Sequence, residues 1–367
     1  MRRGQSGSAV AESKFMRAQI AGFLVNIIGA IAISGIASAQ IYVADAGNKR
    51  VGEYSMSGAA VNASLISGFN APGSEGPLDV AIAGTNLYVL SIIFNGVDGI
   101  GTIGKYNLDG TVVNASLITN ITGYPQNLAI SDTNIFVASG NSGVIGKYTT
   151  SGATINASLI TGLNAPEQMA ISGTNLFVAV FQGKTIAEYT TAGATVNSLL
   201  ITNLGQVNGV AISGTNLFTA ETSARRIGKY TTTGTVIANA LISNLGSPRV
   251  LAISGTNLFV TDDSGNKVGA YGFSGTTNNA TLISGLLFPY GIAVAPTFQS
   301  ITPTNSAVIL TWNAIEGRNY QVQYKTNLTQ PGWINFLGPI MATTVTASAS
   351  NHISVDPQRF YRVLFLP

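Results

Sequence analysis

Short apolar runs alternate with short polar turns along most of this chain, and the alternation repeats. Around one alanine the sequence reads DVAIAGTNLYV, NLAISDTNIFV, QMAISGTNLFV, GVAISGTNLFT and VLAISGTNLFV in successive copies. The later copies are spaced by 41 residues, as marked by Ala129, Ala170, Ala211, Ala252 and Ala293. The first copy, at Ala81, lies 48 residues before Ala129, so one unit carries seven extra residues. A repeat of this length indicates an array of similar supersecondary units.

Each unit predicts four short strands. In the copy that begins at Val250, strands are expected over residues 250–254, 258–261 and 268–271, with an outer strand that ends at Ile283. Gly, Asn and Ser turns separate these segments, and no window shows the 3.6-residue period of a helix. Four strands of about six residues with turns of about four residues account for a period of about 40. Such a unit, repeated around an axis, is a β-propeller blade.

The two ends of the array predict how the ring closes. Residues 41–66 supply the second, third and fourth strands of a blade that has no first strand, and residues 289–295 supply an isolated first strand. With five intact units, this composite makes six blades, one of which is closed by N- and C-terminal strands. We therefore expect an all-β chain with a six-bladed β-propeller over residues 40–296.

The first blade carries a further pattern. The segment IYVADAGNKRVGEY, residues 41–54, resembles the NHL repeat, in which a strand is followed by Asp, a Gly-Asn loop and a basic residue. The first and last blades keep this pattern, with Asp45, Asn48 and Arg50 and with Asp262, Asn266 and Lys267. The middle blades depart from it, with Ser91, Ser139, Val180 and Glu221 where the Asp would fall. The resemblance therefore implies no interaction common to every blade.

Residues 297–367 form a different unit. They alternate apolar and polar residues and hold both tryptophans, Trp312 and Trp333. The pattern predicts a small β-sandwich, and it resembles the fibronectin-type-III-like modules that end many exported bacterial proteins. We expect a spacer or attachment module; the alternative is a carbohydrate-binding surface around Trp333 and Tyr324.

Residues 1–39 have the features of a signal peptide. Lys14 and Arg17 precede an apolar run over residues 18–36, and Ala37-Ser38-Ala39 is a cleavage box. The start is Met1 or Met16, and the alternative interpretation is a retained membrane anchor. We expect an exported protein, secreted, periplasmic or on the cell surface, with no stable membrane span after cleavage.

Charge and composition exclude several classes of function. Only 9% of the residues are charged, and the net charge of +3 becomes zero when residues 1–39, with four basic residues and one acidic residue, are removed. We therefore expect no nucleic-acid partner. The absence of Cys excludes a thiolate nucleophile, and a lone histidine excludes a multi-His metal site. That histidine, His352, has no nucleophile elbow to act with.

Candidate binding residues follow from position in the repeat. The residues three and two positions before each repeat alanine are expected to converge at one mouth of the channel. These candidate ligand-binding residues are Asp79, Asn127, Glu167, Gln168, Asn208, Arg249 and Tyr290. The variable loops around the same mouth add a second set, which comprises Asp45, Arg50, Glu221, Arg225 and Asp262. We expect Arg249 either to anchor a ligand or to pair with Glu167 across the channel.

These observations favour a binding protein without catalysis, a monomer whose extracellular ligand, protein partner or glycan partner is unknown. No cofactor is predicted, although the oxygen atoms of Asp79, Asn127, Glu167 and Asn208 would suit Ca²⁺ or Mg²⁺. That set is similar to the metal site of six-bladed lactonases of the gluconolactonase class, which implies a metal-dependent hydrolase or lyase as an alternative. A purely structural cell-envelope protein is the third interpretation.

Overall fold

The computed structural model describes residues 23–26, 40–304, 307–327, 329–352 and 358–366, and within these ranges it contains strands and no helix. Accordingly, the described ranges hold no helix that could cross a membrane. The expected signal peptide lies outside the described residues except for β1 (Phe23–Asn26). The backbone of β1 pairs with β31 (Gln358–Leu366).

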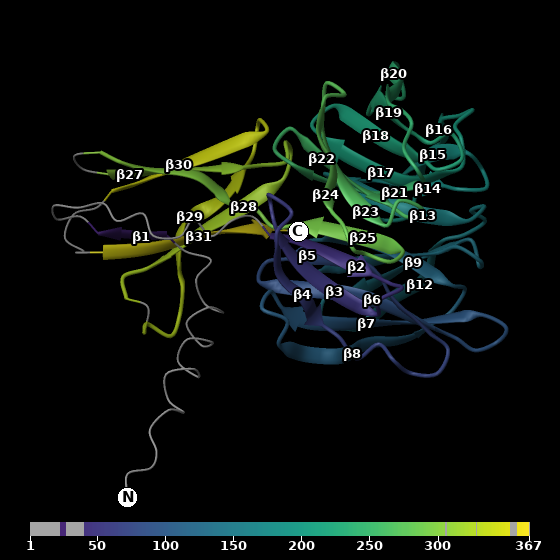
Figure 1. Ribbon diagram of the computed structural model, residues 1–367, viewed down its shortest axis with the longest axis horizontal. Coiled ribbons are helices and arrows are strands. Elements are labelled where there is room, and N and C mark those ends of the chain that lie inside the picture. Colours follow the sequence, from purple (N-terminus) through teal and green to yellow (C-terminus); the bar gives the residue numbers. More distant parts are fainter. Residues whose placement is uncertain (1–22, 27–39, 305–306, 328, 353–357, 367) are drawn as a thin grey trace, which may run out of the picture.

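Six four-stranded antiparallel sheets form the propeller, and Figure 1 shows them on one side of the molecule. Blade 1 consists of β25 (Pro289–Val294), β2 (Gln40–Asp45), β3 (Arg50–Ser55) and β4 (Ala60–Ile66). Blade 2 consists of β5 (Ser74–Ala83), β6 (Asn86–Phe94), β7 (Gly99–Asn107) and β8 (Val112–Ile121). Blade 3 consists of β9 (Pro125–Ser131), β10 (Asn134–Ser139), β11 (Val144–Thr149) and β12 (Thr154–Ile160).

The other three blades follow the same order from the axis outward. Blade 4 consists of β13 (Pro166–Ser172), β14 (Asn175–Val180), β15 (Thr185–Thr190) and β16 (Thr195–Ile201). Blade 5 consists of β17 (Val207–Ser213), β18 (Asn216–Glu221), β19 (Arg226–Thr231) and β20 (Val236–Ile242). Blade 6 consists of β21 (Pro248–Ser254), β22 (Asn257–Asp262), β23 (Lys267–Gly272) and β24 (Thr277–Ile283).

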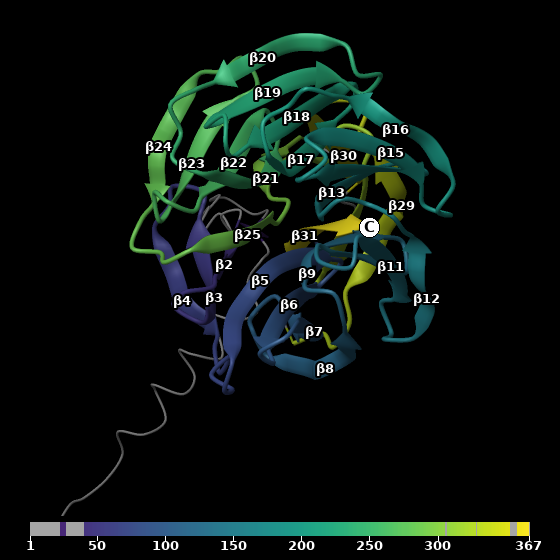
Figure 2. The ribbon, with the colours of Figure 1, turned by 90° about the vertical axis from the view of Figure 1, so that its right-hand side faces the viewer.

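The composite blade is confirmed. Strand β25 pairs antiparallel with β2, so that Val294 lies opposite Ile41 and Ile292 lies opposite Val43. The inner strands then contact one another in the order β5, β9, β13, β17, β21 and β25, and β25 contacts β5 again. Figure 2 is a view along the axis of the ring, and the inner strands lie around that axis. The ring is therefore closed by two segments from opposite ends of the repeat array.

The second strand of each blade is buried on both faces because the blade packs between two neighbours. Strand β14, NLFVAV, is buried from its second residue to its last. Phe136 and Ile145 of blade 3 pack with Met169 and Leu176 of blade 4 in one apolar cluster. Burial of this kind contributes about 1.5–3 kcal/mol for each large side chain. Six of the seven extra residues of blade 2 lie in a longer β6–β7 hairpin, and the seventh lies between Ile118 of β8 and Pro125 of β9.

The outer strands all contain bulges, and an asparagine marks most of them. In five blades the side-chain oxygen of an Asn accepts a hydrogen bond from the amide two residues later, at Asn62, Asn114, Asn156, Asn197 and Asn279. The pairing register with the third strand shifts at this position. A bulge twists an exposed strand away from the geometry that a second sheet would need for pairing.

The C-terminal residues form a β-sandwich. One sheet has the order β26 (Phe298–Pro303), β27 (Ala307–Asn313) and β30 (Thr346–His352). The other has the order β1, β31, β28 (Asn319–Lys325) and β29 (Ile334–Met341). Trp312, Tyr320 and Tyr361 lie in the core between the two sheets. The fibronectin-type-III assignment of this sandwich stays a prediction.

The ring has two ends with different surroundings. The turns between first and second strands form one end, which we call the turn face, and the loops between blades form the other, the loop face. The sandwich sits against the turn face, because the Gly84 amide donates to the Phe365 carbonyl at 2.9 Å and the Gly214 amide donates to that of Glu316 at 3.2 Å. Figure 1 shows the sandwich beside the ring. The loop face is therefore the end of the ring that the sandwich leaves free.

Candidate functional site

Every inner strand carries a register shift near the loop face. In blade 3 the shift falls at Gln126, and in blade 4 it falls between Pro166 and Met169. The inner strands of the other four blades shift at the corresponding place. A bulge inserts an extra residue and re-aims the side chains beside it. Two consecutive residues of each inner strand therefore lie at the bulge.

These side chains form two layers. We call the residues two positions before the repeat alanine the channel belt, which consists of Asp79, Asn127, Gln168, Gly209, Val250 and Gly291. We call the residues three positions before it the mouth ring, which consists of Leu78, Gln126, Glu167, Asn208, Arg249 and Tyr290. The channel cavity is lined by Asp79, Asn127 and Gln168 of the belt, but by no residue of the mouth ring. The mouth ring therefore lies on the loop-face side of the belt.

Asp79 and Asn127 join neighbouring blades. The Asp79 carboxylate accepts hydrogen bonds from the side chain of Asn127 at 2.6 Å and from the amide of Leu128 at 2.9 Å. The Asn127 side-chain oxygen in turn accepts from the amide of Met169 in the next blade at 3.0 Å. Burial raises the pKa of Asp79 to about 7, although these hydrogen bonds favour its charged form.

Gln168 extends the same belt across two further blades. Its side-chain oxygen accepts from the amides of Val210 at 3.1 Å and Leu251 at 3.0 Å, and its nitrogen donates to the Leu251 carbonyl at 2.8 Å. A side chain at Gly209 would place its Cβ 3.1 Å from the Gln168 oxygen. Glycine at this position therefore leaves the space through which Gln168 reaches blade 6.

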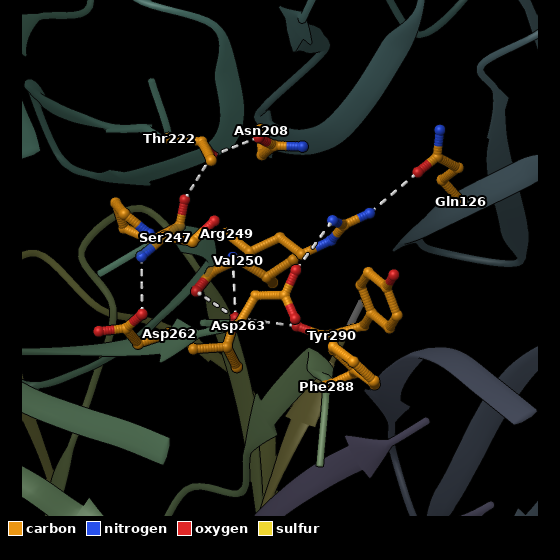
Figure 3. Close-up of polar contacts among 12 residues, drawn as sticks. Gln126, Asn208, Thr222, Ser247, Arg249, Val250, Asp262, Asp263, Phe288 and Tyr290 are labelled. Carbon is orange, nitrogen blue, oxygen red and sulfur yellow. Dashed lines mark hydrogen bonds and ion pairs between the residues drawn. The ribbon is translucent and has the colours of Figure 1, made fainter. Parts of the chain in front are cut away.

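Arg249 dominates the mouth ring, and Figure 3 shows its contacts. Its guanidinium lies over the ring of Tyr290, 3.8 Å from the centroid, and donates to the side-chain oxygen of Gln126 at 3.1 Å. Gln126 belongs to blade 3, which is opposite blade 6 in the ring, so this bond crosses the mouth. The ion pair of Arg249 is with Asp263, at 3.7 Å, and both side chains are 20% exposed. Of the two alternatives for Arg249, the ion pair with Glu167 is not formed in the part of the chain that the structure describes.

Glu167 is a buried carboxyl group of the same ring. It forms side-chain hydrogen bonds with Asn208 and Gln126, and burial raises its pKa to about 7 while the charge of Arg249 lowers it. Asn208 also accepts a hydrogen bond from Thr222. The mouth ring thus brings together a cation, a phenol, two amides and a carboxyl group that titrates near neutral pH.

Two residues of this site were missed by counting within the repeat. Tyr124 lies two residues before Gln126, and its hydroxyl donates to the carboxylate of Glu75 at the start of β5 in blade 2. Its ring packs with that of Tyr290 against a small apolar cluster. The aromatic residue directly before Pro125 was the available signal, but the repeat places no residue type there in common.

The predicted loop-face acids are buried scaffold residues. Asp45 accepts from Arg50 at 2.9 Å, and its second oxygen accepts from the Leu287 amide at 2.7 Å. Each bond ties the end of a second strand to another segment of blade 1. These groups are therefore occupied within the protein.

The corresponding positions in blades 5 and 6 behave alike. Glu221 pairs with Arg226 at 2.8 Å and accepts from the Gly205 amide at 2.8 Å. Asp262 accepts from two amides of the loop that enters its blade, at 3.0 and 2.7 Å. Arg225 donates to a backbone carbonyl of the following inter-blade loop at 2.8 Å. Of the twelve sequence-predicted candidates, Glu167, Asn208, Arg249 and Tyr290 are brought together in the mouth ring.

The suggested metal-binding set does not fit a divalent ion in this arrangement. The bonded oxygens of Asp79 and Asn127 accept from neighbouring groups, and that of Asn208 accepts from Thr222. The four residues also fall in two layers, two in the belt and two in the mouth ring. Within the described ranges, no group of three or more His, Cys, Asp or Glu residues could hold a metal ion. We derive no chemistry through a metal.

Comparisons with known proteins agree with the architecture. No family model matches this chain, and no curated protein matches its sequence. A chain in a crystal structure of a nidogen/laminin complex has a TM-score of 0.57 at 17% identity, over 70% of this chain and 98% of that chain. An inactive virginiamycin B lyase from Staphylococcus aureus with quinupristin has a TM-score of 0.47 at 14% identity, over 79% and 91%. The calcium-binding protein regucalcin from Agrobacterium tumefaciens has a TM-score of 0.46 at 12% identity, over 61% and 78%. At these identities the likeness shows the fold alone.

Proposed function

We propose that this chain is an exported binding protein whose loop face receives a partner protein, with Arg249 and Tyr290 at the centre of the contact. The observation that carries the proposal is the guanidinium of Arg249, stacked on Tyr290 in the middle of the free face. It has one amide hydrogen bond and one ion pair at 3.7 Å. Arg and Tyr are the residue types that most often dominate the energy of protein interfaces. An acidic side chain of the partner could take the place of Gln126.

Exposed apolar residues surround this centre. Ile93, Phe94 and Val97 lie at the tip of the extended β6–β7 hairpin, and Val97 is 89% exposed. Leu287 and Phe288 lie in the loop that leads to β25, and Phe288 is 50% exposed. Clustered exposed apolar residues on one face are typical of an interaction surface. A similar fold also occurs in the structure of the nidogen/laminin complex, a complex of two proteins.

Catalysis at the same site is the second candidate. The observation in its favour is Glu167, a buried carboxyl group with a pKa of about 7 beside a guanidinium. A group that titrates near the working pH is suited to general acid–base catalysis. A purely structural role is favoured by a different observation, namely that Gln126 and Arg249 already bond to each other across the mouth.

The test begins with peptides selected from a random display library on the full chain. Their affinity is then compared for the unchanged protein, Arg249→Ala and Lys184→Gln. Lys184 is exposed in the β14–β15 loop on the same face, and its substitution removes the same charge away from the mouth. We expect Arg249→Ala to weaken binding by about 1.5–3 kcal/mol, the scale of a hydrogen bond to a charged group. Lys184→Gln should change it by less than about 0.5 kcal/mol.

Three outcomes separate the candidates. Equal binding by both variants would remove Arg249 from the contact and overturn the proposal. Selection that yields no binder, together with a large fall in melting temperature for Arg249→Ala, would favour the structural role. Substrate turnover that is lost in Glu167→Gln would favour the enzyme.

A further inference from the structure

A cavity lies in the channel on the sandwich side of the belt. Its volume is about 180 Å³, and we call it the channel chamber. Its wall is lined by the six repeat alanines, Ala81, Ala129, Ala170, Ala211, Ala252 and Ala293. The isoleucine or valine that follows each alanine also contributes. Small alanine side chains keep the axis open where larger ones would fill it, and this explains why the repeat holds alanine here.

The sandwich supplies the other end of the chamber. Ile315, Arg318 and Phe365 join the lining from β31 and from the loop before β28. Their position is fixed by backbone hydrogen bonds between Phe365 and Gly84 and between Glu316 and Gly214. The view in Figure 2 shows β31 behind the opening of the ring. The chamber is therefore shared by both parts of the protein.

Arg318 has no anionic partner in this place. Within the described ranges its guanidinium makes no hydrogen bond and no ion pair, and its ring contact is with Phe365, at 5.5 Å from the centroid. Arg318 is partly exposed, and burial lowers its pKa. A partly desolvated cation without an anionic partner gains free energy when it pairs with a bound anion.

Asp79 is the other charged residue of the described lining, and it belongs to the belt. Its carboxylate is held there by Asn127 and by the amide of Leu128. The charged groups that face the chamber therefore differ in kind: a cation on the sandwich side and a carboxyl group in the belt. The wall between them is apolar.

We propose that the channel chamber binds a small monocarboxylate with a short alkyl chain, whose carboxylate pairs with Arg318. A guanidinium binds a carboxylate through two parallel hydrogen bonds, and the alanine and isoleucine wall takes the alkyl chain. A dicarboxylate is disfavoured because its second charge would meet the apolar wall or Asp79. Inorganic phosphate is disfavoured because it leaves the apolar wall unfilled.

Calorimetric titration of the full chain tests this with sodium butyrate, hexanoate, succinate and phosphate. We expect hexanoate and butyrate to bind more tightly than succinate and phosphate. Arg318→Gln should weaken hexanoate binding by about 10- to 100-fold, which corresponds to a lost hydrogen bond to a charged group. Arg362→Gln is the matched control, because Arg362 is also a desolvated arginine of the sandwich but bonds to Gln323 outside the chamber.

A second variant tests whether the ligand binds inside the channel chamber, independently of the charge of Arg318. Ala129→Leu should fill part of the chamber and weaken hexanoate binding without changing Arg318. The melting temperature of Arg318→Gln without ligand should equal or exceed that of the unchanged protein, since a desolvated charge is removed. The proposal is overturned if no carboxylate binds, if Arg318→Gln and Arg362→Gln bind hexanoate equally, or if phosphate binds as tightly as hexanoate.

Discussion

The channel belt and the mouth ring are one residue apart in the sequence, yet they have opposite characters. In the belt, the side-chain oxygens of Asn127 and Gln168 accept hydrogen bonds from backbone amides of neighbouring blades, and both residues are buried. In the mouth ring, Gln126 and Arg249 bond to each other's side chains and are partly exposed. Side chains that bond to the backbone hold blades together, whereas side chains that bond to one another can exchange partners.

This difference shows how adjacent positions of a repeat can make different kinds of contact. The bulge in each inner strand re-aims two adjacent residues, so one position can serve the scaffold and the next can vary. Both positions vary in sequence here, but for different reasons. The belt residues differ because each spans a different gap, and the glycines at 209 and 291 make room for longer neighbours.

The largest effect is expected when the belt is broken. Gln168→Met should lower the free energy of unfolding by about 2–5 kcal/mol, because two buried amides, of Val210 and Leu251, lose their acceptor. Chemical denaturation measures the change. The matched variant in the mouth ring, Gln126→Met, should cost less than about 1.5 kcal/mol because it loses a bond to a partly exposed side chain. Similar losses for both variants would abolish the distinction between the layers.

A smaller effect is expected from pH. Burial raises the pKa of Asp79 and that of Glu167 to about 7, whereas both groups titrate near pH 4 in an unfolded chain. Between about pH 4 and pH 7 the folded protein therefore binds more protons than the unfolded chain does. The stabilisation that protonated Asp79 and Glu167 contribute is lost as the pH rises through this window.

The belt carboxyl should carry more of this dependence than the mouth carboxyl, because Arg249 offsets only the charge of Glu167. We expect the free energy of unfolding to be about 1–3 kcal/mol higher at pH 5 than at pH 8. Asp79→Asn should flatten the profile more than Glu167→Gln does. Denaturant titrations at several pH values provide the comparison, and a flat profile in the unchanged protein would contradict it.

The smallest effect on stability is expected for the central residue of the mouth. Arg249→Ala should lower the free energy of unfolding by less than about 1 kcal/mol, because its ion pair with Asp263 is long and both side chains are partly exposed. Glu167 can take up a proton when the cation is removed, since its pKa is already about 7. A loss of several kcal/mol by thermal or chemical denaturation would place Arg249 with the belt.

The repeat period was enough to predict the propeller, because strands of fixed length and a 41-residue spacing leave few alternatives. The closing strand at residues 289–295 was also predictable, since it repeats the first-strand pattern without the strands that follow. The hydrogen-bond partners of the mouth-ring residues were not predictable from the sequence. Gln126 and Arg249 are 123 positions apart, and their contact depends on which blades stand opposite each other. A bulge of one residue also decides which of two neighbours reaches the axis, and no local pattern marks it.

The roles of the loop acids were predicted less well for a related reason. Asp45 and Asp262 match the NHL-like pattern, but the sequence does not show that backbone amides of the inter-blade loop occupy them. Glu221 takes the same place in blade 5 with a longer side chain and with Arg226 as its partner. The packing of the sandwich against the turn face likewise has no signal in the sequence, because the backbone amides of Gly84 and Gly214 form the hydrogen bonds to it.

The asparagine bulge of the outer strands bears on how a ring of this kind can grow. Each 41-residue unit that carries the asparagine also carries the bulge that blunts its own outer edge, as at Asn156 and Asn197. A chain with so few charges has little lysine to place along such edges. Duplication of one unit therefore adds a blade already guarded against edge-to-edge association. The number of blades and the residues of the mouth ring can then change while each copy keeps its bulged outer strand.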